Sequence, residues 1–457
     1  MATSLAEPRG NRTGSRAPGP PAIPLIGNAL AFRRDPIAFL RALARDYGDL
    51  VAFRIGTHRF FLINHPDYIR EILITRQTNF TKSLALQRTK PLLGEGLLTS
   101  EGQHHLRERR LVQPAFHRER LQSYAAIMTE YALEWRATFL ARRDFDMLQK
   151  MTGLSLAIVS KALFRADLER NAQSVSKAMT DVVELFRIVM LPFGDFLNRL
   201  LPSRRRLDRA IAVVKQTVDN IIREHRALAP EKRADSCDLL SALLAARDQD
   251  GSSLTDEQLR DEILTLFVAG HETTAIALTW SWYLLAQHPE CEARLHDEID
   301  SVLAGRTPTF EDLPRLAYTE GVAAEALRLY PPVWVIGRIA KEKFELAGLR
   351  LPKGAVCVIS PYLMHRDPRF YENPDRFDPG RWRPELRDAH PKFSFIPFGG
   401  GARVCIGERF AWSAMILVIA TLAQKWRFRM ADGEPVVAAP RVTLRPSGPV
   451  RMLAVPR

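Results

Sequence analysis

The sequence predicts a mainly α-helical protein with a small β-rich part. Three observations lead to this prediction. The hydrophobic periodicity between residues 67 and 287 is mostly helical, a helix of unusual length begins with a capping pattern at Thr255, and strand-like segments follow Pro331. The 457 residues are 46% hydrophobic and 26% charged, which is an ordinary globular composition. Because no linker divides the chain, we expect a flexible Pro- and Gly-rich tail over residues 1–22 and a single domain over residues 23–457.

The first elements follow from local capping and turn signals. Asp35-Pro36 is typical of an N-cap followed by Pro at the first helical position, which predicts a helix over residues 37–47. Residues 49–64 alternate apolar and polar side chains around Gly56-Thr57, which predicts a β-hairpin. The segment from Thr255 to Gln258 is a capping-box pattern, so a very long helix should run from there to about Gln287.

The last third of the chain is expected to mix strands with one further helix. A helical pattern covers residues 408–423. Strands are expected over residues 344–351 and 355–359, and around Val442 and Met452.

Composition narrows the class of protein. The net charge of +13 allows nucleic acid, an anionic membrane or an acidic protein as partner. No basic stretch with interleaved aromatic residues and no nucleic-acid motif is visible, so we expect no nucleic-acid partner. The four Cys residues lack the spacing of a metal finger or a disulfide framework, which favours a reducing, cytoplasmic location.

A transmembrane anchor is not expected either. The first 22 residues contain no apolar run of the roughly 20 residues that a spanning helix needs. The most apolar internal segment, residues 263–286, is interrupted by His271 and Glu272, which favours a buried helix.

The segment over residues 398–407, Phe-Gly-Gly-Gly-Ala-Arg-Val-Cys-Ile-Gly, carries the strongest chemical signal. Glycines accept dihedral angles that other residues refuse and let the backbone pass close to a flat, bulky group. Cys405 precedes a predicted helix, whose N-terminus favours thiolate over thiol, and Arg403 adds positive charge. A thiolate presented in this way is a good ligand for haem iron and favours O–O cleavage.

Phe398, Gly401, Arg403, Cys405 and Gly407 match the pattern F-x-x-G-x-R-x-C-x-G, and here the chain resembles the cytochrome P-450 superfamily, soluble bacterial type. The resemblance covers residues 20–457. It implies the P-450 fold, with haem b (iron protoporphyrin IX) between the long central helix and the Cys-bearing loop and helix. It also implies that Cys405 ligates the iron and that the other four residues help to bind the cofactor.

The long helix contains the sequence Ala-Gly-His-Glu-Thr-Thr at residues 269–274. Gly costs about 1 kcal/mol in a helix interior, and such a violation often marks a functional site. Small residues can let a flat cofactor approach, a Thr hydroxyl can bond a preceding carbonyl, and an adjacent acid can relay protons. By resemblance, Thr273 stabilises the activated oxygen and Glu272 helps proton delivery. The alternative is a core helix with a few buried polar residues.

Haem propionates are anionic and need cations or hydrogen-bond donors. By resemblance we expect His105 and Arg109 at the propionates, with His104 as the alternative to His105, and Arg338 and Arg403 as further partners. Glu325-x-x-Arg328 resembles a buried pair that is locked to an Arg downstream, for which Arg376 is the candidate.

These features predict a haem-thiolate monooxygenase that inserts one oxygen atom from dioxygen into a hydrophobic small molecule, which could be a terpenoid, a fatty acid or a polyketide-like compound. Two alternatives remain open: a peroxide-dependent haem-thiolate enzyme, and a non-enzymatic haem-binding sensor or carrier. No reductase domain is fused to the chain, so electrons should come from an acidic ferredoxin or flavodoxin with its NAD(P)H reductase. The partner would dock on a basic patch that includes Arg107, Arg110 and Arg409.

By analogy, the walls of the substrate pocket come from several separate segments. These are residues 80–97, residues 185–196, Phe267, Ala269, residues 333–336 and Ser447. Phe186, Phe193 and Trp334 suggest a hydrophobic substrate, and ordinary core packing is the alternative reading of these three.

Overall fold

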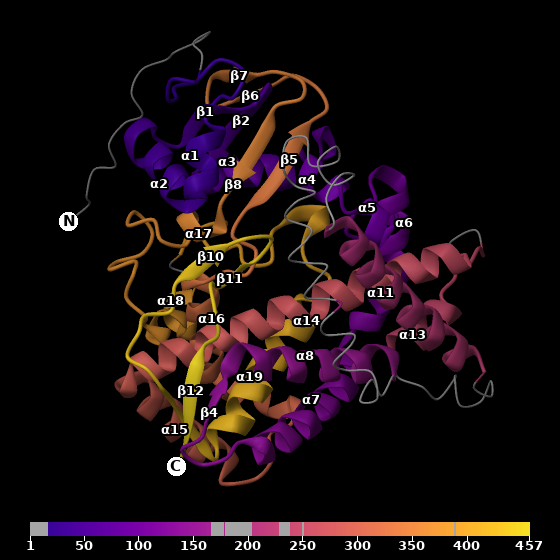
Figure 1. The fold of residues 1–457 in the computed structure, drawn as a ribbon, viewed down its shortest axis with the longest axis vertical. Helices are drawn as coiled ribbons and strands as arrows, with labels where there is room; N and C mark the ends of the chain where they lie inside the picture. Colours follow the sequence, from indigo (N-terminus) through magenta and orange to yellow (C-terminus); the bar gives the residue numbers. More distant parts are fainter. Residues whose placement is uncertain (1–16, 166–177, 179–202, 228–237, 249–250, 388–389) are drawn as a thin grey trace.

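The computed structural model describes residues 17–165, 178, 203–227, 238–248, 251–387 and 390–457. Long helices form the larger part of the molecule, and a twisted sheet with short helices forms the smaller part (Figure 1). The predicted fold class, mainly α with a small β-rich part, is confirmed. Residues 1–16 of the predicted tail lie outside the described residues, and Pro18 accepts a hydrogen bond of 2.7 Å from the Ala52 N–H.

The helical segments from the N-terminus to the long central helix are α1 Ala29–Arg34, α2 Pro36–Tyr47, α3 Pro66–Arg70, η1 Glu71–Thr75, η2 Gln77–Asn79, α4 Leu84–Gln87, α5 Lys90–Leu93, α6 Gly102–Val112, η3 Gln113–Phe116, α7 Arg118–Thr138, α8 Met147–Phe164, α11 Ser203–Arg226, α13 Leu239–Ala245 and α14 Asp256–Gln287. Those that follow are α15 Pro289–Leu303, η5 Phe310–Arg315, α16 Ala317–Leu329, α17 Pro361–Met364, η6 Pro379–Trp382, α18 Pro384–Arg387, η7 Gly401–Arg403 and α19 Glu408–Ala423.

The strands are β1 Leu50–Ile55, β2 His58–Ile63, β3 Phe80–Lys82, β4 Asp144–Asp146, β5 Ile336–Ala340, β6 Phe344–Leu346, β7 Leu349–Leu351, β8 Val356–Ile359, β9 Trp426–Met430, β10 Ala438–Pro440, β11 Leu444–Pro446 and β12 Arg451–Pro456. The largest sheet has the order β1-β2-β8-β5-β3, and β12 lies between β4 and β9 in a second sheet.

Most predicted elements form where local signals placed them. The Asp35 side chain accepts a hydrogen bond from the Ala38 N–H and caps α2. The hairpin closes with Ile55 opposite His58. The strand expected around Val442 is misplaced, because Val442 is exposed in the turn that joins β10 to β11.

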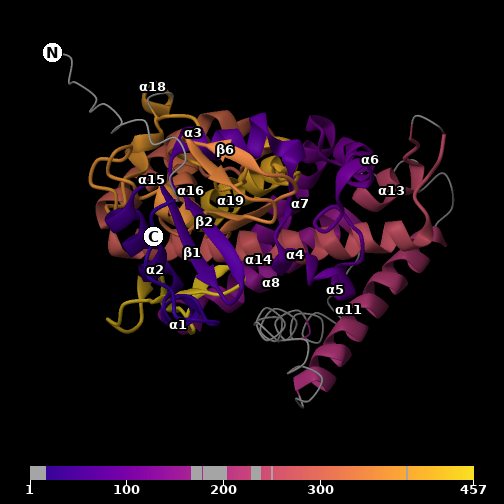
Figure 2. The ribbon, with the colours of Figure 1, turned by 90° about the horizontal axis from the view of Figure 1, so that it is seen from above.

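Helix α14 is the central element of the helical part. Thr255 forms the predicted capping box with Gln258, and the helix runs for 32 residues with α8, α16 and α19 packed against it. Figure 2 shows that it crosses most of the molecule. By length and composition it could cross a membrane, but 72% of its most apolar window is buried inside the protein. It is therefore buried like a core helix, as predicted for residues 263–286.

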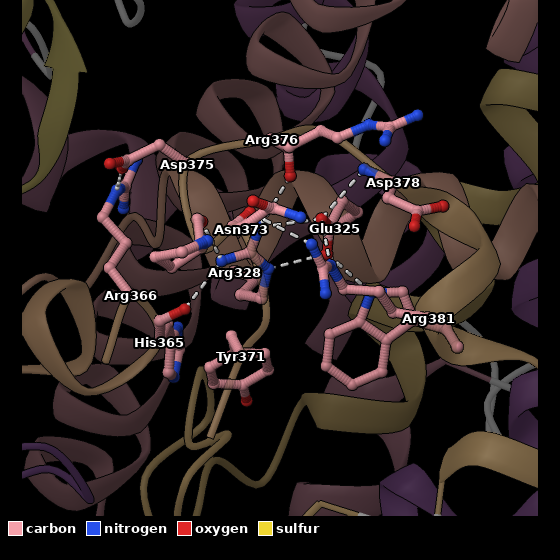
Figure 3. Close-up of polar contacts among 12 residues, drawn as sticks. Glu325, Arg328, His365, Arg366, Tyr371, Asn373, Asp375, Arg376, Asp378 and Arg381 are labelled. Carbon is pink, nitrogen blue, oxygen red and sulfur yellow. Dashed lines mark hydrogen bonds and ion pairs between the residues drawn. The ribbon is translucent and has the colours of Figure 1, made fainter. Parts of the chain in front are cut away.

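A buried ion pair ties α16 to the segment that precedes the Cys-bearing loop (Figure 3). Glu325 and Arg328 are both fully buried, and the guanidinium donates two hydrogen bonds of 2.8 Å to the carboxylate. The remaining Arg328 donors bond the carbonyl oxygens of His365, Pro374 and Arg376. Each charge is thus satisfied on all sides, as a buried pair requires.

The prediction that the Arg376 side chain joins this pair is wrong. The Arg381 guanidinium, and not that of Arg376, lies 3.3 Å from the Glu325 carboxylate, and the Trp382 indole donates a further bond at 2.9 Å. The exposed Arg376 side chain points away from the pair and offers only its backbone carbonyl (Figure 3).

Candidate functional site

The loop that carries Cys405 is fixed by backbone hydrogen bonds before α19 begins. The Cys405 N–H donates to the Phe398 carbonyl at 3.0 Å, and Arg109 of α6 donates to the Val404 carbonyl at 2.8 Å. The Phe398 ring packs on Trp412 of α19 with a centroid distance of 5.6 Å. The Cys405 side chain remains accessible although protein surrounds most of it. This geometry presents one accessible thiol at the head of a helix.

The glycines of this loop pack against the protein itself. Gly401 has a φ of 72°, and a Cβ at this position would lie 1.9 Å from the carbonyl oxygen of Leu73 in η1. A Cβ at Gly400 would lie 3.0 Å from the Phe393 ring. Gly401 is therefore required by contact with η1.

The charge state expected for Cys405 needs a correction. Burial raises the pKa of the thiol to about 11, although the Gly407 N–H and Arg109 act in the opposite direction. The helix N-terminus and nearby Arg residues therefore do not produce a thiolate by themselves. A metal ion deprotonates a coordinating thiol outright, so coordination is what would bring Cys405 to the thiolate form.

Cationic side chains gather beside this loop. Lys82 and Arg338 are register partners on β3 and β5, so they lie side by side. Arg403 donates to the Ser100 carbonyl at 2.7 Å and forms an ion pair with Glu101. His105 of α6 is buried next to them. Glu101 also accepts the Lys82 N–H at 2.7 Å, so a carboxylate lies among these cationic groups.

Burial and neighbouring cations lower the pKa values of this cluster. Burial, followed by the charge of Arg403, lowers the pKa of Lys82 to about 6 and that of Arg338 to about 10. Burial, then Arg403 and Lys82, lower the pKa of His105 to about 3. Buried cations without enough counter-charge are costly, so this cluster fits a ligand that brings negative charge.

These residues fit a haem group. The accessible Cys405 thiol would hold the iron, and the surplus of cations matches two propionates. Between the two candidate His residues, the structure buries His105 in the cluster, whereas His104 turns towards Glu108 with 3.7 Å between Nδ1 and Oε1. Lys82 and Glu101 were missed from the sequence, because the pairing of β3 with β5 places Lys82, and contacts with the Lys82 N–H and Arg403 place Glu101.

The Thr residues of α14 face two different directions. The Thr273 hydroxyl donates to the Ala269 carbonyl at 2.8 Å, as expected for a Thr in a helix. Thr274 donates to the Gly270 carbonyl at 3.1 Å. A Cβ at Gly270 would lie 3.2 Å from Val159, so Gly270 faces α8. Of Ala269 and Gly270, only Ala269, which is exposed, lies on the same helix face as Thr273.

Glu272 is held by the β10–β11 hairpin. The Thr443 hydroxyl donates to its Oε1 at 3.1 Å, and an Arg445 nitrogen lies 3.9 Å from the same oxygen. Burial raises the pKa of Glu272, and Arg445 and Thr443 oppose this effect. A raised pKa makes this carboxylate a better proton acceptor, which suits a group that relays protons. His271 is also buried, and burial lowers its pKa to about 4.

Some residues expected to line a substrate pocket are packed in the core. Trp334 is buried and donates to the Arg441 carbonyl at 2.9 Å, and Phe267 packs against Phe164. Phe186 and Phe193 lie outside the described residues.

The predicted basic patch is partly neutralised. Arg107 and Arg110 each lie 3.2 Å from an Asp248 carboxylate oxygen, whereas Arg409 of α19 is exposed.

Comparison with known proteins agrees with this geometry. Residues 17–452 match the family model described as Cytochrome P-450. The chain is 40% identical to Cyclooctatin synthase of Streptomyces melanosporofaciens, over 96% of this chain and 95% of that protein. It is 37% identical to Cyclooctat-9-en-7-ol 5-monooxygenase of the same organism, over 100% and 98% of the two chains. It is 38% identical to Pentalenene oxygenase of Streptomyces avermitilis, over 93% and 94%.

Proposed function

Because the chain belongs to the cytochrome P-450 family of haem monooxygenases, we propose that Cys405 supplies its iron ligand and that its substrate is a terpenoid hydrocarbon or alcohol. The observation that carries the ligand assignment is the accessible Cys405 thiol at the head of α19. The names of the relatives, an alkenol monooxygenase and an oxygenase of pentalenene, support the substrate class. Dioxygen is the oxygen source, and separate redox partners supply the electrons.

Different residues around Cys405 would bind different parts of haem b. His105, Arg109, Arg338 and Arg403 would bind the propionates, and Lys82 joins them. Phe398, Gly401 and Gly407 shape the loop that presents the thiol. When bound, the haem supplies the activation of dioxygen.

Thr273 and Glu272 would manage protons on α14. The Thr273 hydroxyl shares its face with the exposed Ala269 and donates its hydrogen to the Ala269 carbonyl, so its oxygen would accept a hydrogen bond from the reaction space. Glu272 would relay protons, and its contacts with Thr443 and Arg445 hold its carboxylate in place.

Thr273→Ala is expected to lower product formation by about 100-fold, at the low end of general acid–base effects. Electrons should then leave as hydrogen peroxide, because the hydroxyl no longer directs the proton. The measurement is product and peroxide formed per NAD(P)H consumed.

Thr274→Ala is the matched control, because it removes the neighbouring hydroxyl, which bonds Gly270 on a different helix face. Thr273→Ser should restore coupling. Equal uncoupling in both alanine variants would remove the assigned role of Thr273.

We propose an acidic ferredoxin or flavodoxin as electron donor. Arg409→Glu should slow reduction severalfold at low salt, and high salt should slow the wild type similarly, because charge steers the encounter. The control is Arg59→Glu, an exposed arginine on β2. Salt-independent reduction, or equal effects of the two variants, would contradict docking at Arg409.

The alternatives remain distinguishable. A peroxide-dependent enzyme would form product from hydrogen peroxide alone, and the paired Glu272 and Thr273 argue against it. A sensor or carrier would bind substrate without turnover with any donor. Screening terpenoids against fatty acids of similar size for a shift of the haem Soret band tests the substrate class.

We also propose a cytoplasmic location, which the free thiols of Cys291 and Cys357 support.

A further inference from the structure

Two glutamates that the proposed mechanism does not use meet in the interior between α6 and α14. Glu108 is 1% exposed and Glu262 is 0% exposed, and their side chains lie within hydrogen-bonding reach of each other. Within the part of the chain that the structure describes, Oε2 of Glu108 and both carboxyl oxygens of Glu262 make no well-directed hydrogen bond. Two buried carboxylates in contact cannot both stay ionised, so the geometry demands a proton between them.

The surroundings decide which glutamate keeps the proton. Burial, and then the charge of Glu108, raise the pKa of Glu262 to about 8. Burial also raises the pKa of Glu108, but His104 and Arg107 oppose it, and the Arg107 guanidinium lies 3.1 Å from its Oε1. The negative charge therefore resides on Glu108, and Glu262 is the neutral acid.

The pair lies under the loop over residues 94–101. The Lys82 Nζ holds this loop by donating to the Leu97 carbonyl at 2.9 Å and to that of Leu98. The Leu97 N–H approaches the Glu262 carboxyl on the other side. The Glu95 N–H donates to Asp261 of α14 at 2.8 Å.

The same loop continues to the cationic cluster. Its Ser100 carbonyl accepts a hydrogen bond from Arg403, and Glu101 forms the ion pair with that residue. The charged and titratable groups that face the pair are Lys82 from β3, Asp261 from α14, and His104 and Arg107 from α6. Asp248 pairs with Arg107 at the surface.

We propose that Glu108 and Glu262 share one proton, and that this proton positions the loop over residues 94–101 against α14 as a wall of the substrate pocket. When the proton is lost, two buried carboxylates repel each other, α6 and α14 separate locally, and the loop loosens. Substrate binding then weakens at alkaline pH. The link to the substrate pocket rests on the proposed function, whereas the shared proton and the fixed loop do not.

The sign of the pH dependence follows from the direction of the shift. Below the ordinary pKa of a glutamate, the folded and unfolded chains both hold the Glu262 proton. As pH rises from there to about 8, the unfolded chain releases the proton and the folded chain keeps it, so stability falls. Above that range Glu262 no longer makes the free energy of unfolding depend on pH. Glu262→Gln, a neutral isostere, should therefore remove the pH dependence that Glu262 causes.

Infrared spectroscopy of the haem-loaded protein tests the shared proton without any activity measurement. The wild type minus Glu262→Gln difference spectrum should show the carbonyl stretch of a protonated carboxyl at about pH 7, shifted in heavy water and lost above about pH 8. Glu257→Gln, on the exposed first turn of the same helix, should leave that band unchanged. Absence of the protonated band at neutral pH would overturn the proposal.

Hydrogen exchange tests the loop. After correction for intrinsic rates, exchange of residues 94–101 in the wild type should rise severalfold between about pH 7 and about pH 9, and should stay flat in Glu262→Gln. Glu108→Gln serves if the first variant folds poorly, and it should give the same flat profile. Substrate affinity should fall over the same pH range in which exchange of the loop rises. An exchange profile without pH dependence in the wild type would refute the positioning role, whereas failure to bind any terpenoid would refute only the proposed substrate.

Discussion

Cys405→Ser is expected to abolish oxygenation while leaving the helical fold intact. The side chain is accessible and is not one of the buried residues of the hydrophobic core, so replacing its sulfur by a hydroxyl should cost little packing. A serine hydroxyl does not replace a thiolate as a ligand that donates electron density to iron. The measurement is product formation with saturating redox partners, together with the visible spectrum of the haem-loaded variant.

Cys291→Ala is the matched control for this experiment. Cys291 is a buried thiol on α15, outside the candidate site, so its loss should leave the spectrum unchanged. Retained oxygenation in Cys405→Ser would mean that another residue ligates the iron.

Arg328→Met should be the most destabilising single change, at about 3–5 kcal/mol, because it leaves a buried charge without its partner. The Glu325 carboxylate would lose two hydrogen bonds, and the carbonyl oxygens of His365, Pro374 and Arg376 would each lose a donor. The midpoint of denaturant unfolding of the haem-loaded protein measures this loss.

The control for this prediction is Arg376→Ala. That side chain is exposed and only its backbone joins the network, so the cost should stay within about 0.5 kcal/mol. A loss as large as that of Arg328→Met would mean that Arg376 stabilises the pair in a way that the structure does not show.

Elements with strong local signals were predicted closely. The Asp35 cap, the turn at Gly56-Thr57 and the capping box at Thr255 each fix a boundary through neighbours a few residues away. Helix α19 covers the predicted residues 408–423. The weak strand signal near Val442 failed, because a turn between two three-residue strands leaves little periodicity to detect.

Features that depend on distant segments could not be predicted from one sequence. Arg376 and Arg381 are equally plausible along the chain, and only the path of the backbone brings Arg381 to Glu325. Lys82 meets Arg338 through strand pairing across more than half of the chain. Glu108 and Glu262 likewise meet through helix packing, which no motif indicates.

The error in the charge of Cys405 has a quantitative cause. A helix N-terminus favours a negative charge by about 0.3–1 kcal/mol, whereas full burial can shift a pKa by up to about 3–5 units in the opposite direction. Burial therefore outweighs the dipole at this thiol, and the thiolate form depends on the metal.

The carbon monoxide difference spectrum of the reduced, haem-loaded wild-type protein tests the central claim most directly. Ligation by Cys405 predicts the strongly red-shifted Soret band of a thiolate-ligated haem, and this band should vanish in Cys405→Ser. A band at the position typical of a histidine-ligated haem, in folded and fully loaded protein, would contradict the account.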